Sequence, residues 1–63
     1  MIYLTFNDSD KRYVVECPNE NIFNEVAMDI NSRVGFKNLR KNVKGKFDKE
    51  RVILSYKEYK DKI

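Results

Sequence analysis

Residues 2–17 read IYLTFNDSDKRYVVEC, and this stretch decides the fold that we expect for the chain. On both sides of the central NDSD, apolar side chains alternate with other residues, which is the pattern of two strands that each bury one face. The short polar side chains of NDSD can bond to the backbone of a turn. The stretch therefore predicts a β-hairpin.

A helix is expected next, from about residue 20 to residue 33. Pro18 ends the second strand, and Asn19 or Asn21 can cap the start of the helix. Gly35 is placed to end the helix. At helical spacing the apolar side chains gather on one side, which then packs on the hairpin: Ile22, Phe23, Val26, Ala27, Ile30 and Val34.

Residues 36–47 fit two structures. Phe36, Leu39 and Val43 have the spacing of a short helix, whereas Val43, Gly45 and Phe47 alternate with lysines as in a strand. The apolar run at 52–56 favours a loop followed by a strand, because residues 42–57 then close as a second hairpin. The sequence thus predicts a single domain over residues 1–57 and a charged flexible tail over residues 58–63.

The order strand, strand, helix, strand, strand predicts an α+β domain. We expect a β-grasp-like ββαββ arrangement, a single sheet with one helix packed across one face and with the first strand between the second and the fourth. The run Val15-Glu16-Cys17-Pro18-Asn19-Glu20-Asn21-Ile22, followed by Val26, Ile30 and Gly35-Phe36, resembles the part of ubiquitin-like proteins in which a Pro ends the second strand and a Gly closes the helix.

This resemblance covers residues 1–36 and implies a non-catalytic binding domain. The sequence ends Lys60-Asp61-Lys62-Ile63 and has no Gly-Gly tail, so a covalent modifier role is not expected.

The composition excludes several classes of protein. The 63 residues leave room for one domain, and the 41% hydrophobic content with eight aromatic residues indicates that it folds. Without His and with Cys17 alone, the chain cannot build a disulfide framework, a zinc cage or a Cys/His catalytic pair. We therefore expect no enzyme, no cofactor and no metal. No signal peptide or membrane segment follows Met1, so a cytoplasmic location without membrane contact is expected.

Charge is distributed unevenly along the chain. Residues 1–32 carry two basic and six acidic side chains, a net charge of −4, whereas residues 33–63 carry eleven basic and four acidic ones, a net charge of +7. The densest basic stretch, residues 37–51, holds seven basic and two acidic side chains. Such a field attracts polyanions or acidic protein surfaces.

A candidate binding surface follows from the two faces of the sheet. If the helix covers one face, alternation sends Tyr3, Val14 and Ile53 to the other, with Lys44 and Lys46 at its rim. No other segment is expected to cover these side chains. The face as a whole is expected to carry Tyr3, Thr5, Arg12, Val14, Lys44, Lys46, Ile53, Ser55 and Lys57.

Two functions fit these observations. The first is a small protein-binding module that uses this face and the adjacent basic stretch, either against a host protein or, in a homodimer, against a second copy. The Lys-, Asn- and Ile-rich composition is typical of AT-rich genomes and suggests a phage or mobile-element modulator. The alternative is nucleic-acid binding, with phosphates contacted from the basic stretch by Lys37, Arg40, Lys41, Lys49 and Arg51, and bases stacked on Phe36, Phe47 or Tyr3.

Overall fold

The hairpin predicted from residues 2–17 forms the centre of the sheet. In the computed structural model, which describes residues 1–63, β1 (Ile2–Asp8) pairs antiparallel with β2 (Lys11–Cys17), with Ile2 opposite Cys17 and Asp8 opposite Lys11. The alternation of the sequence is preserved in space. On the side that faces the helices, four alternate side chains of the two strands are fully buried, Leu4, Phe6, Val15 and Cys17, while Ile2 and Tyr13 are partly buried.

Helix α1 (Glu20–Asn31) packs across one face of this hairpin. The Asn19 side chain caps the helix by accepting a hydrogen bond from the backbone N–H of Ile22 at 2.9 Å. Val26 and Ile30 are buried against the sheet. The helix ends two residues earlier than expected, with Ser32 as its C-cap, so Gly35 lies beyond its end and Val34 is fully exposed.

Strand β3 (Phe36–Asn42) pairs antiparallel with the free edge of β1. Its register shifts between Thr5 and Asn7, so two residues of β3 oppose one residue of β1. Asn38 lies in this bulge with a φ of 60°, a conformation that Asn tolerates better than most residues. The extra residue reverses the alternation, so Phe36 packs on Phe6 in the core while Arg40 lies on the opposite face.

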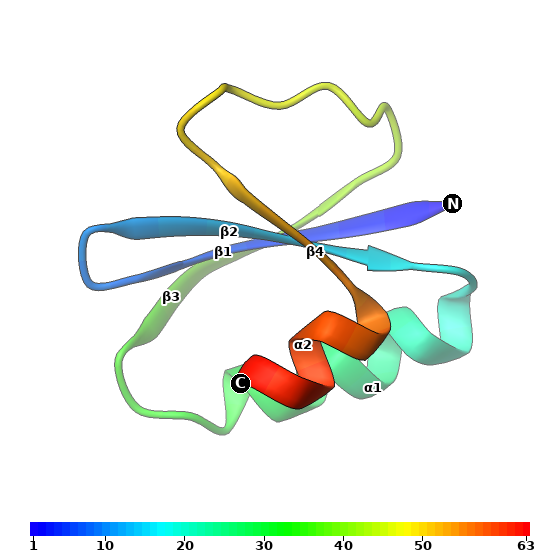
Figure 1. Ribbon diagram of the computed structural model, residues 1–63. Coiled ribbons are helices and arrows are strands. Elements are labelled where there is room, and N and C mark those ends of the chain that lie inside the picture. Colours follow the sequence, from blue (N-terminus) through cyan, green and yellow to red (C-terminus); the bar gives the residue numbers. More distant parts are fainter.

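The predicted fold class is confirmed, but the expected strand order is wrong. Strand β4 (Val52–Ser55) runs parallel to β2, and the sheet has the order β3-β1-β2-β4. The second strand, rather than the first, is therefore the neighbour of the fourth. Residues 42–57 do not form a hairpin, because β3 and β4 lie at opposite edges and residues 43–51 cross between them (Figure 1).

The charged tail expected over residues 58–63 is instead mostly helical. Helix α2 (Tyr56–Lys62) starts at a capping box, in which the Ser55 side chain accepts from the backbone N–H of Glu58 and the Glu58 side chain accepts from that of Ser55. Tyr59 is buried, and its hydroxyl donates to Asp29 of α1. Tyr56 donates to Glu25 in the same way. Both helices therefore lie on one side of the sheet (Figure 1).

Neither helix is long and apolar enough to cross a bilayer.

Candidate functional site

The face of the sheet opposite the helices, which we call the open face, is partly covered by residues 43–51, which we call the crossing loop (Figure 1). The loop starts where the Asn42 side chain accepts a hydrogen bond from the backbone N–H of Lys44 at 2.8 Å. Phe47 then packs edge-on against Tyr3 with ring centroids 5.2 Å apart. Gly45 passes so close that a Cβ there would lie 3.2 Å from the Tyr3 ring. Tyr3 therefore anchors the loop over the sheet.

The expected apolar patch of Tyr3, Val14 and Ile53 is not exposed as a unit. Val14 is fully buried, because it lies on an inner strand between Thr5 and Ile53, on the face that the crossing loop overhangs. Tyr3 is half-buried beneath the loop. Only Ile53, which is 51% exposed, presents a large apolar surface, so the expectation that nothing covers this face is wrong.

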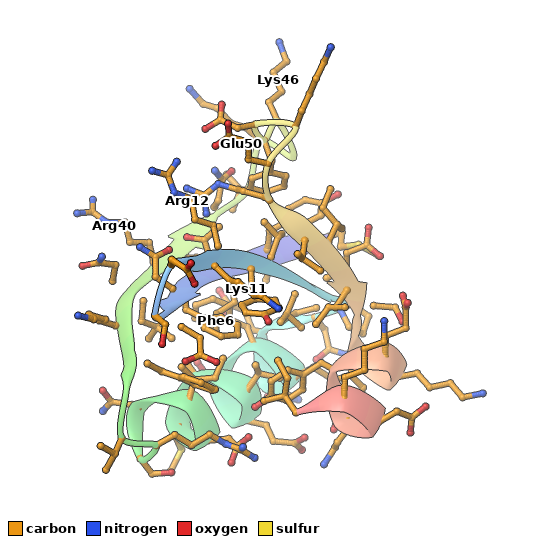
Figure 2. All side chains as sticks on the ribbon, turned by 60° about the vertical axis from the view of Figure 1, so that its left-hand side comes forward. Phe6, Lys11, Arg12, Arg40, Lys46 and Glu50 are labelled. Atoms are coloured by element: carbon orange, nitrogen blue, oxygen red, sulfur yellow. The ribbon has the colours of Figure 1, made fainter.

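Three of the four arginines gather on the open face. Arg12 comes from β2 and lies opposite Asn7, Arg40 comes from β3 and lies opposite Thr5, and Arg51 directly precedes β4. Figure 2 shows Arg12 and Arg40 projecting to the side of the sheet away from both helices. With three polar neighbours, Thr5, Asn7 and Asn38, these arginines line a hollow of about 360 Å³.

A second hollow continues the first toward the crossing loop. It measures about 230 Å³ and shares Thr5, Arg40 and Arg51 with its neighbour. Since the shared residues stand between them, the two hollows form one groove, which we call the basic groove. The second hollow adds these lining residues from the end of β3 and from the loop: Asn42, Lys46, Phe47 and Asp48, together with Lys41, whose ammonium group nevertheless lies on the helical side against Glu20.

The positive charge of the basic groove is weakly neutralised. Arg12 approaches Asp48 at 3.9 Å, at the limit of an ion pair, and both side chains are more than half exposed. Arg40 and Arg51 form no ion pair with any carboxylate. Exposed pairs of this kind contribute little, so the guanidinium groups stay available to an anion.

Of the lysines named from the sequence, Lys41 is turned toward the helices. Its ammonium pairs with Glu20 of α1 and lies 5.2 Å from the centre of the Phe23 ring. This follows from the register, since Lys41 lies opposite Leu4, whose side chain belongs to the core. Lys37, Lys44, Lys46 and Lys49 are exposed.

The sequence-based choice of nucleic-acid contacts missed Arg12, although alternation had already placed it on the open face. It lies outside residues 37–51, so a search for the densest basic stretch passes over it. The signal that finds it is the pairing of the hairpin, which sets Arg12 two residues along β2 from Val14 and on the same face. Thr5 and Asn38 carry no charge, and their role in lining the groove appears only in the assembled sheet.

Two other features carry less chemistry. Burial raises the pKa of the Cys17 thiol to about 11, which keeps the sulfur protonated and agrees with its expected place in the core. A hollow of about 410 Å³ at the hairpin end is lined by side chains of both signs, including Lys11 and Lys62 with Asp10 and Glu50. Its mixed charges favour no class of ligand.

Comparison with known proteins identifies no relative: no family model matches the chain, and neither a curated protein nor a solved structure is significantly similar to it.

Proposed function

We propose that this protein binds nucleic acid by contacting backbone phosphates in the basic groove. The observation that carries the proposal is the convergence of Arg12, Arg40 and Arg51, from three separate parts of the chain, around Thr5. Arginine is suited to this task, because its planar guanidinium presents paired donors that match the oxygens of a phosphate.

The surroundings of the groove support a polyanion rather than a single small anion. Lys46 lines the groove, and Lys44 and Lys49 lie exposed on the same crossing loop. Charges spread in this way attract a chain of phosphates over several contacts. An acidic protein is the other occupant that such a surface would attract, and the apolar contacts first expected for a protein partner are reduced here to Ile53.

The proposal is tested by fluorescence anisotropy with labelled oligonucleotides over a range of salt from about 50 to 200 mM. We expect the logarithm of the binding constant to fall linearly with the logarithm of the salt concentration. Replacing Arg12, Arg40 and Arg51 together by Gln should weaken binding by about tenfold or more. The slope should fall by about 2, which corresponds to three lost phosphate contacts.

A matched control removes the same amount of charge elsewhere. Lys11, Lys57 and Lys62 are exposed and do not line the basic groove, so their joint replacement by Gln should change affinity much less. Equal losses in the two triple variants would show that net charge, and not the groove, holds the nucleic acid. If the wild-type protein binds no nucleic acid at low salt, an acidic protein partner becomes the better explanation of the arginines.

A further inference from the structure

We infer that the nucleic acid held by this groove is single-stranded, with its phosphates along the arginines and a base on Phe47. The inference rests on the proposed function and adds the form of nucleic acid that the groove admits. Three observations carry it: the crossing loop that partly covers the groove, the placement of the helices, and the position of one aromatic ring.

The crossing loop limits what can reach the floor of the groove. Thr5 lies in the sheet and is 8% exposed, while the loop is held over the same face by Tyr3, Gly45 and Phe47. The whole molecule measures 26 × 26 × 20 Å. A duplex is stiff over the length of so small a protein and cannot follow a surface that is partly covered by a loop, whereas a flexible single strand can.

The helices also argue against a duplex. Both α1 and α2 pack on the face of the sheet opposite the basic groove (Figure 1). A helix is one of the two elements that enter the major groove of a duplex, and here neither helix lies on the basic side. The basic side offers instead the two connected hollows of the groove.

The groove has different chemistry at its two ends. The hollow bounded by Arg12, Asn7 and Asn38 has no carboxylate among its lining residues, so it suits phosphate oxygens. The hollow beneath the loop holds the half-buried Phe47 ring beside Asp48. An aromatic ring offers a stacking surface to any base, and a carboxylate accepts hydrogen bonds from base amino groups while it repels phosphates.

Arg40 and Arg51 line both hollows, so one strand can place a phosphate at the shared arginines and the adjoining base against Phe47.

The test compares one labelled oligonucleotide of about 12 nucleotides, without self-complementarity, with the same oligonucleotide annealed to its complement. We expect the single strand to bind at least about tenfold more tightly. Phe47→Leu, which keeps an apolar contact with Tyr3 but loses the aromatic surface, should weaken single-strand binding by about tenfold and leave the salt slope unchanged. Phe47→Tyr, the control, should retain the wild-type affinity. Thermal unfolding of both variants checks that the loop packing survives.

Two results overturn this inference while leaving the proposed function standing: equal affinity for duplex and single strand, or wild-type affinity in Phe47→Leu. Failure of both forms to bind overturns the proposed function itself.

Discussion

The two faces of the sheet differ in how many of their charged side chains have a partner. On the helical side, three carboxylates of α1 have ion-pair or hydrogen-bond partners: Glu20 with Lys41, Glu25 with Tyr56 and Lys60, and Asp29 with Tyr59 and Arg33. On the open face, only Arg12 approaches a carboxylate, that of Asp48 at 3.9 Å, while Arg40 and Arg51 form no ion pair. Most charge pairs on the helical side join one element of the fold to another, whereas Arg40 and Arg51 on the open face make no such contact. These unpaired arginines are the basis of the proposed function.

The largest expected effect separates core from surface within α1. Val26 is 1% exposed between helix and sheet, so Val26→Asp places an unpaired carboxylate in the core. We expect the free energy of unfolding to fall by more than about 4 kcal/mol, which is enough to unfold a domain of this size. Circular dichroism during heating measures it.

Met28→Asp on the same helix is the control, because Met28 is 75% exposed and its change should stay within about 0.5 kcal/mol. A cooperatively folded Val26→Asp protein would contradict the position of α1 on the sheet.

The second effect concerns the contact between the two helices. The hydrogen bond from the buried Tyr59 hydroxyl is the main reason that the pKa of Asp29 lies below its ordinary value, with the charge of Arg33 acting in the same direction. Tyr59→Phe removes this bond at almost constant volume and should cost about 2 kcal/mol at neutral pH. Thermal unfolding of the variant and the wild type measures the difference.

The sign of its pH dependence follows from the lowered pKa. A carboxylate whose pKa is depressed in the folded state stabilises the fold above its unfolded pKa of about 3.9, and that stability is lost as the pH falls through the folded value. The difference in the free energy of unfolding between the wild type and Tyr59→Phe should therefore be constant near pH 7 and shrink below about pH 4. A difference that persists unchanged in acid would show that packing, rather than the bond to Asp29, accounts for it.

The smallest expected effect on stability concerns the two glycines, of which only Gly45 lies on the crossing loop. Gly45 has a φ of 71° and lies against the Tyr3 ring, whereas Gly35 has a φ of 96° with nothing within 4 Å of an added Cβ. Gly45→Ala should cost about 1 kcal/mol by backbone strain and also push the crossing loop from Tyr3, which weakens binding in the groove. Gly35→Ala carries a similar strain and should leave binding unchanged. Equal affinities in the two variants would mean that the loop does not shape the site.

The hairpin and α1 could be read from the sequence, whereas two elements were missed: β3 at Phe36–Asn42, where a loop or a short helix was expected, and α2, although the signal for α2 was present. The hairpin followed from strict alternation around a polar turn, and the start of α1 followed from the Asn19 cap. Helix α2 also has a sequence signature, since Ser55 and Glu58 have the spacing of a capping box before Tyr59. The many charged residues after residue 56 led instead to the expectation of a flexible tail. The alternation at 43–47 misled in the other direction, because a loop that packs Phe47 on one ring shows the same pattern as a strand.

By itself the sequence determined the elements that depend on near neighbours: the central hairpin, the amphipathic α1 and the side chains with which these two pack on each other. Only the tertiary structure decided which sheet edge each later strand joined. Both outer edges of the hairpin were free, and the crossing loop is long enough for either, since its nine residues can span about 30 Å against roughly 14 Å across four strands. The bulge at Asn38 then set Arg40 on the open face, opposite to Phe36. The groove depends on contacts between distant residues, and local patterns in a sequence do not specify those.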